Sequence, residues 1–110
     1  MIIRYALFEG QVYPDQMAAF QRAVIEEVLP LWKKFPHANA VRVSFARSRD
    51  PGAQEFPMIL AVTYPNLEAV DMALGSPVRI EARAATEKVL SRFFTGKVHH
   101  HVMDAEEQEL

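Results

Sequence analysis

The sequence contains no cysteine among its 110 residues. This absence excludes disulfide bonds, thiol nucleophiles and zinc sites built on cysteine ligands, and it suits a reducing compartment. No apolar run approaches the roughly 20 residues that a membrane-spanning helix needs. The first residues, Met1 to Tyr5, lack the basic and then apolar order of a signal peptide. We therefore expect a cytoplasmic protein that does not enter a membrane.

An excess of charge of one sign is also missing. Twelve Lys and Arg residues stand against fourteen Asp and Glu residues, which gives a net charge of −2 and a pI near 6.1. This balance provides no basic footprint for nucleic acid or for an anionic membrane, so neither is expected as a partner. The four glycines form no phosphate-binding loop.

The residues that are present have the composition of a globular domain. Half are hydrophobic and 24% are charged. β-Branched, aromatic or alternating apolar residues predict strands at 2–9, 40–47, 57–64 and 97–104. The polar segment between the second and third strands, with Asp50-Pro51-Gly52 at its centre, predicts a hairpin loop.

Three helices are expected between these strands. Apolar residues at three- and four-residue steps predict the first helix after Pro14, with a kink or an end near Leu29 because Pro30 lacks a backbone N–H. Asn66 and Ser76 are expected to cap the second and third helices, which end at Gly75 and Gly96.

The resulting order is β-α-β-β-α-α-β, the split β-α-β pattern of the ferredoxin-like α+β fold. It predicts a four-stranded antiparallel sheet in the strand order 4-1-3-2, with helices on one face. Residues 1–104 form the single domain, and residues 105–110 form an acidic tail that we expect to be frayed.

Alternation along the strands assigns side chains to the two faces. We expect the most apolar sets to face the helices, together with His100; these are Ile3, Tyr5, Leu7, Val41, Val43 and Phe45. The other face then receives Arg4, Ala6, Phe8, Arg42, Ser44, His99, His101 and Met103. This second face is too apolar to be bare, so it is expected to meet a second copy of the chain in a homodimer.

The layout resembles the dimeric α/β barrel proteins, and within them the EthD (ethyl tert-butyl ether degradation) type. The passage Val28–Pro36 (VLPLWKKFP) is similar to the family's His-x-Pro-Leu … Lys-Leu-Pro-Gly passage, although Val28 stands where the family has a histidine. Asn66–Ala69, Ala73–Pro77 and Glu81-Ala82 resemble the family's helix, break, Ser-Pro, helix segment. The resemblance implies a dimeric barrel that binds a small, fairly apolar molecule, with oxidoreductase or isomerase chemistry that needs no metal or flavin cofactor.

The helix side carries the first candidate site. His100 and Tyr5 are expected to be neighbours there, with Trp32 and Tyr64 as substrate-binding walls. A histidine beside a phenol can act as acid, base or orienting group on a carbonyl substrate near neutral pH. The alternative is a core histidine that makes one hydrogen bond, with the aromatic residues only packing.

The open side carries the second candidate site. Arg4 and Arg42 are expected there and would hold a carboxylate substrate by bidentate contacts. His99 and His101 are two residues apart on the same strand, but no Asp or Glu shares that strand's face, so we expect interface residues and no metal site.

Two functions remain open on this evidence. One is a cofactor-independent enzyme of the monooxygenase type acting on a small apolar organic compound, with His100 and Tyr5 as catalytic residues. The other is a non-catalytic binding or accessory protein of a degradation pathway that uses the same pocket.

Overall fold

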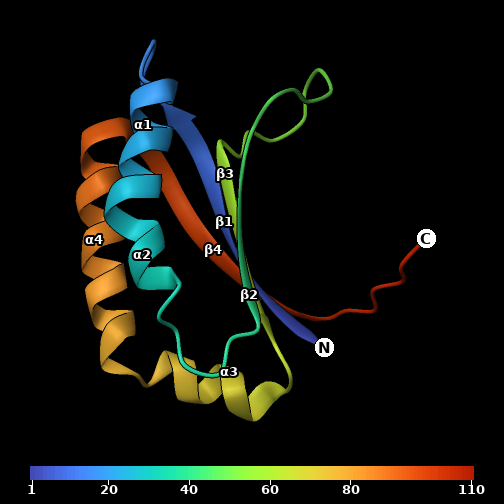
Figure 1. Cartoon of the computed structure of the whole chain (residues 1–110). Helices are drawn as coiled ribbons and strands as arrows, with labels where there is room; N and C mark the ends of the chain where they lie inside the picture. The colour runs from blue at the N-terminus through green and yellow to red at the C-terminus, as the bar shows by residue number, and fades with distance from the viewer.

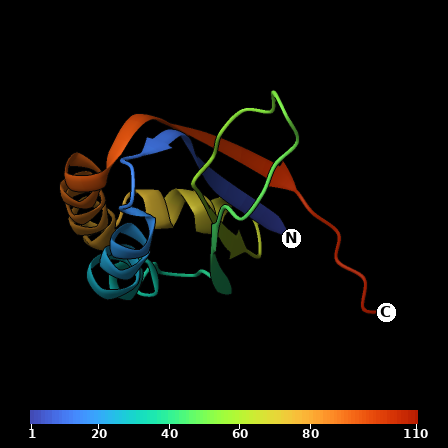
Figure 2. The same cartoon turned by 90° about the horizontal axis from the view of Figure 1, so that it is seen from above.

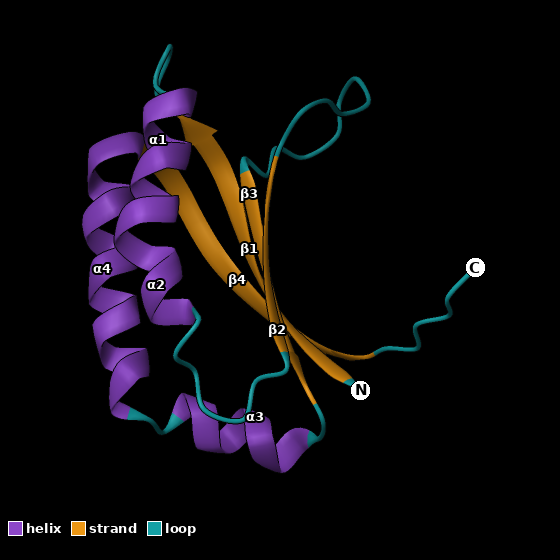
Figure 3. Ribbon diagram, in the orientation of Figure 1, coloured by secondary structure: helices purple, strands orange, loops and turns teal.

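The computed structural model describes residues 1–110, which form four strands and a set of helices. The strands pair antiparallel in the order β2-β3-β1-β4 (Figure 3). The chain therefore has the expected ferredoxin-like α+β fold and the expected strand order. The elements are β1 (Ile2–Val12), α1 (Met17–Ala23), η1 (Val24–Val28), α2 (Leu29–Trp32), β2 (Ala40–Phe45), β3 (Met58–Tyr64), α3 (Leu67–Leu74), α4 (Pro77–Phe93) and β4 (Phe94–Asp104).

The helices lie on one side of the sheet. Helices α1, η1, α2 and α4 cover one face, and α3 lies at the end of the sheet near the start of α4 (Figure 1). The view from above shows no helix on the other face (Figure 2). None of the helices has both the length and the apolar composition that crossing a membrane requires.

The two long strands β1 and β4 extend beyond their expected ends. Gly10 was expected to end β1, but the strand runs on to Val12 and pairs with β4 as far as Phe94. Gly10 and Gly96 are direct partners, with φ of 152° and 153°. A Cβ on either would collide with the backbone of the other strand, so the absence of a side chain lets the strands remain paired here.

The first helix changes from α-helical to π-helical geometry just before Pro30. The five residues Val24–Val28 form a π-helical turn, and Pro30 falls in the first turn of α2. The π-helical turn comes shortly before Pro30, so the helix changes its hydrogen-bond pattern next to the residue that has no N–H to donate. The helix thus continues to Trp32, which places this side chain over the sheet.

The expected caps are only partly present. The Asn66 side chain accepts a hydrogen bond from the Ala69 N–H at 2.9 Å and caps α3 as expected. Ser76 occupies the N-cap position of α4, but its hydroxyl donates to the Ala73 carbonyl at 2.6 Å and leaves the helix uncapped by a side chain. The end of α4 at Phe93 comes before Gly96, because β4 begins at once.

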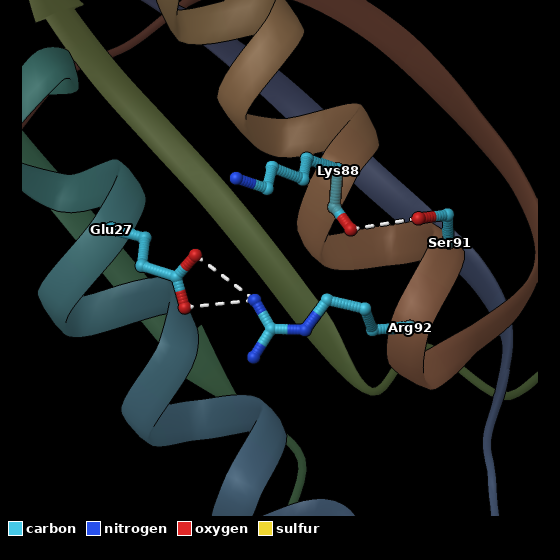
Figure 4. Close-up of polar contacts among 4 residues, drawn as sticks. All are labelled: Glu27, Lys88, Ser91 and Arg92. Carbon is cyan, nitrogen blue, oxygen red and sulfur yellow. Dashed lines mark hydrogen bonds and ion pairs between the residues drawn. The ribbon is translucent and has the colours of Figure 1, made fainter.

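An ion pair of two side chains joins helix α4 to η1. Arg92 of α4 donates to both carboxylate oxygens of Glu27 on η1 at 2.9 and 3.0 Å (Figure 4). The Arg92 guanidinium also lies 4.9 Å from the centre of the Phe93 ring. In the same close-up, the Ser91 hydroxyl donates to the Lys88 carbonyl at 2.8 Å. These contacts are exposed, so they orient the helices more than they stabilise them.

The core lies between the helices and the sheet. Phe20 of α1 packs edge-on against Phe45 and Phe93 with ring centres 6.2 Å apart. On β1 the buried residues are Ile2, Ala6 and Phe8, so the expected orientation of this strand was wrong. Ile3, Tyr5 and Leu7 face the open side although they are the more apolar set. The expected orientations of β2 and β4 agree with the pairing register.

Candidate functional site

A cavity of about 430 Å³ lies between the sheet and helix α4. Its floor is formed by deeply buried side chains, among them Trp32 at 3% exposure and Phe8 at 2%. Its mouth lies between α4 and the edge strand β4, where the exposed His100, Arg83 and Glu87 line it. A volume of this size is in the range of small-molecule sites. The apolar lining residues are Ala6, Phe8, Trp32, Phe35, Leu60, Ala82, Leu90 and Val98.

Small residues at facing positions leave the space unfilled. Ala6 is the partner of His100 across the β1–β4 pairing and of Leu60 across the β1–β3 pairing. Ala82 lines the cavity from α4. A larger side chain at either alanine would occupy part of this volume, so the cavity follows from these two choices of residue.

The polar part of the cavity is cationic. Arg4 projects from β1, Arg79 and Arg83 project from α4, and His100 projects from β4. The arginines of α4 are four residues apart and therefore lie on one side of the helix. Arg83 is paired with Glu87 at 3.3 Å. None of the four ion pairs in the structure includes Arg4 or Arg79.

Three groups of this region have shifted pKa values. Burial, and then the charge of Arg79, lower the pKa of the Arg4 guanidinium. Partial burial, and then the charges of Arg4, Arg79, Arg83 and His99, lower the pKa of the His100 imidazole below its ordinary value. Burial raises the pKa of the Tyr64 phenol. His100 is therefore neutral near pH 7 and is available to accept a proton or a hydrogen bond.

The structure separates the two residues that the sequence analysis paired as catalytic. His100 is on the helix side as expected, but Tyr5 faces the open side, where its strand partner is His101. The reversed orientation of β1 causes this difference. Tyr5 cannot act together with His100 in one site of this chain.

The expected arginine pair is separated as well. Arg4 lies on the helix side, in the cavity, whereas Arg42 is exposed on the open side of the edge strand β2. The sheet stands between the two guanidinium groups, so they cannot hold one carboxylate. Trp32 lines the cavity with Arg4 and His100, and Tyr64 is 1% exposed in the core without lining the cavity.

The α4 side of the site is not among the residues predicted from the sequence. Residues Arg79, Ala82, Arg83, Thr86, Glu87 and Leu90 recur at three- and four-residue steps and all line the cavity. This row of residues lies beside the buried side of the same helix, which consists of Ala82, Val89 and Phe93, and Ala82 belongs to both. The Arg79–Arg83 spacing was the available signal.

The open side carries the remaining histidines. His99 and His101 share that side with Glu9, Tyr5 and Leu7. His99 Nε2 lies 3.2 Å from Glu9 Oε1, although the alignment is not that of a hydrogen bond. An acid is therefore near the histidines, from the neighbouring strand, but no three His, Asp or Glu side chains come together as metal ligands would.

Comparisons with known proteins define the class of fold. No protein-family model matches the sequence, and no curated protein sequence matches it. An ethyl tert-butyl ether degradation (EthD) family protein from Bacillus halodurans superimposes with a TM-score of 0.70 at 17% identity, over 96% of this chain and 100% of that one.

Two further solved structures extend this comparison. A dimeric protein of unknown function and ferredoxin-like fold from Bacteroides fragilis has a TM-score of 0.64 at 17% identity, over 94% and 95% of the two chains. SnoaB, a cofactor-independent oxygenase from Streptomyces nogalater, has a TM-score of 0.60 at 13% identity, over 97% and 94%. The chain thus shares the ferredoxin-like fold of these solved structures.

Proposed function

We propose that this protein binds a small organic molecule in the cavity between the sheet and α4. The observation that carries the proposal is a ligand-sized space with apolar walls and a few convergent polar groups at its mouth. His100 stands at the mouth, where an entering molecule meets it first. The structural likeness to an EthD family protein and to a cofactor-independent oxygenase supports a small-molecule site in this fold.

The proposed reaction is a monooxygenation that uses O₂ and no cofactor. In such a reaction one oxygen atom enters the substrate, the other leaves as water, and the substrate itself supplies the electrons. The role of His100 is to take a proton from an acidic O–H or C–H group of the substrate, because its lowered pKa keeps the imidazole neutral. The charges of Arg4 and Arg79 then stabilise the substrate anion that results.

A non-catalytic binding role is the second candidate. The observation in its favour is that His100 makes no hydrogen bond to a carboxylate or carbonyl, whereas a catalytic histidine is commonly oriented by one. In this case the protein binds its ligand in the cavity and releases it chemically unchanged.

Oxygen consumption separates the two candidates. The purified protein is incubated in air with a panel of electron-rich phenols, and O₂ uptake is followed with an electrode. An enzyme consumes O₂ and substrate in equal amounts, and His100→Ala lowers the rate by about 100-fold or more. His101→Ala, on the other side of the sheet, is the matched control and retains the rate. Binding without O₂ uptake would contradict the oxygenase and leave the binding role.

The second part of the proposal is a homodimer formed through the open side of the sheet. The register places Ile3, Tyr5, Leu7, Ile59 and Ala61 on that side, where each is partly buried. Figure 2 shows no helix over this face of the sheet. Several neighbours of the fold are described as dimeric proteins. Two sheets packed face to face would remove this apolar strip from water and keep both cavities on the outside. Sedimentation equilibrium should give twice the mass of one chain.

A further inference from the structure

The charges inside the cavity do not balance. Its lining contains three arginines and a single acid, Glu87, and that acid is paired with Arg83 at 3.3 Å. Arg4 and Arg79 are left over. The one polar contact of the Arg79 side chain is a long one, 3.4 Å from Nη1 to the Leu74 carbonyl oxygen.

Arg4 is an unusual residue for its position. It lies on the core-facing side of β1, whose other members on that side are Ile2, Ala6 and Phe8. Its direct partners on the two flanking strands are Val62 and Val102, and neither of these side chains can accept a hydrogen bond. The Arg4 side chain is partly buried and none of the ion pairs includes it, so its guanidinium loses part of its hydration without gaining a charged partner.

The neighbouring guanidinium adds to this cost. Arg79 is near enough for its charge to oppose that of Arg4, as the lowered pKa of Arg4 reflects. Two like charges in one partly dry cavity repel each other, and an anion bound to both offsets the repulsion and gives each guanidinium a charged hydrogen-bond partner.

We propose that Arg4 and Arg79 form the subsite for a carboxylate group, and that the ligand is an apolar carboxylic acid whose hydrocarbon or aromatic body lies against Trp32, Phe35 and Leu90. This assignment rests on the proposed binding role of the cavity and specifies its ligand. A carboxylate fits because each of its oxygens can accept N–H groups from a guanidinium fork. A phosphate fits less well, because no glycine-rich loop of backbone N–H groups lines the cavity.

Trp32 gives a direct signal of binding. It is the single tryptophan of the chain and it lines the cavity at 3% exposure. A ligand in contact with its ring should change the intrinsic fluorescence excited at the red edge of tryptophan absorption. The two probes are 3-phenylpropanoate and its neutral amide, 3-phenylpropanamide, which share the same phenyl body and differ in charge.

The expected result is that the acid binds at least about tenfold more tightly than the amide. Arg4→Gln and Arg79→Gln should each lower the affinity for the acid by about tenfold and leave the affinity for the amide unchanged. Arg4→Lys keeps the charge without the fork and should lose less than Arg4→Gln. The matched control is Arg22→Gln, an exposed arginine of α1 that lies outside the cavity, and it should bind both probes as the wild type does.

The outcomes separate this assignment from the proposed function. Equal binding of acid and amide, unchanged in both arginine variants, would overturn the carboxylate subsite and leave the cavity as a site for neutral molecules. No fluorescence response to either probe at millimolar concentration would overturn both. Circular dichroism of each variant shows that a loss of affinity is not a loss of fold, and Arg79→Gln, at a partly exposed helix position, provides the test if the Arg4 variants do not fold.

Discussion

The two faces of the sheet both combine apolar side chains with arginine and histidine, but the chain covers only one of them. On the helix side, Arg4 and His100 line a cavity closed below by Trp32 and Phe8. On the open side, Arg42 and His101 stand on the two edge strands with solvent around them. The same residue types therefore differ in hydration, and this difference gives the helix side its shifted pKa values and makes it the side of the proposed ligand site.

Strand β1 contributes to both faces of the sheet. Alternate residues of β1 contribute to the core and to the proposed dimer surface, and a step of one residue moves a side chain from one to the other. Adjacent positions on β1 are thus natural pairs for testing the roles of the two faces.

The largest expected difference is between Phe8 and Leu7. Phe8→Ala removes a side chain that is 2% exposed and should lower the free energy of unfolding by roughly 3–5 kcal/mol at any protein concentration. Leu7→Ala should cost below about 1 kcal/mol in dilute protein and more in concentrated protein, because Leu7 is only partly buried in the single chain and the rest of its surface would be covered in the dimer. Denaturant unfolding at two protein concentrations checks this. A large cost of Leu7→Ala that is independent of concentration would argue against the dimer surface.

A charge on the open side should break the dimer. Leu7→Glu places an unpaired carboxylate at the centre of the proposed interface, and the dissociation constant should rise at least about 100-fold. The control is Ile80→Glu, on the outer side of α4, where the side chain is 74% exposed and no loss of dimer is expected. Sedimentation equilibrium measures both. A Leu7→Glu protein that remains dimeric would place the interface elsewhere.

Exchange of an arginine for leucine should act oppositely on stability and binding in the cavity. Arg4→Leu removes an unpaired, partly buried charge and should raise the free energy of unfolding by up to about 1 kcal/mol while abolishing the preference for an acid. Arg42→Leu, on the exposed edge strand, should stay within about 0.5 kcal/mol of the wild type. Thermal unfolding without ligand distinguishes the two. A destabilised Arg4→Leu protein would mean that Arg4 serves the fold.

The smallest expected effect is the contribution of His100 to the pH dependence of stability. Burial and nearby positive charges hold the pKa of the imidazole in the folded state below its ordinary value. The charged groups are Arg4 from β1, Arg79 and Arg83 from α4, and His99 from β4. The nearby acid Glu87 is paired with Arg83. Above about pH 6.5 the imidazole is neutral in both the folded and the unfolded chain, so protonation of His100 does not lower the free energy of unfolding there. As the pH falls below this value the unfolded chain takes up the proton first, so stability is lost until the pH passes the lower, folded pKa.

His100→Gln should therefore flatten the stability curve between about pH 7 and pH 5. Chemical denaturation at several pH values measures the slope. An identical slope in the wild type and in His100→Gln would contradict the proposed environment of His100.

The sequence predicted the frame of the molecule well. Four strands, the long helix after Pro77 and the hairpin loop around Gly52 were found where turn residues and apolar periodicity indicated them, and the order of elements gave the strand order. The orientation of β4 also followed from alternation, so His100 was assigned to the correct side. These features depend on local patterns, which a sequence carries directly.

The orientation of β1 could not be obtained in this way. Alternation divides a strand into two sets of residues, but it does not say which set is buried when both are apolar. Ile3, Tyr5 and Leu7 are more apolar than Arg4, Ala6 and Phe8, and both faces of this sheet need apolar residues if a second copy covers one of them. The contrast within β1 therefore pointed to the wrong face, and with it misplaced Tyr5 and Arg4.

Local sequence patterns were sufficient to predict the fold and to place one histidine on the helix side. That Arg4, Arg79 and His100 line one cavity follows only from the packing of β1, α4 and β4, which come together there from distant parts of the chain. Two small residues, Ala6 of β1 and Ala82 of α4, line the empty space, and a space between elements leaves no periodic pattern in the sequence of either element.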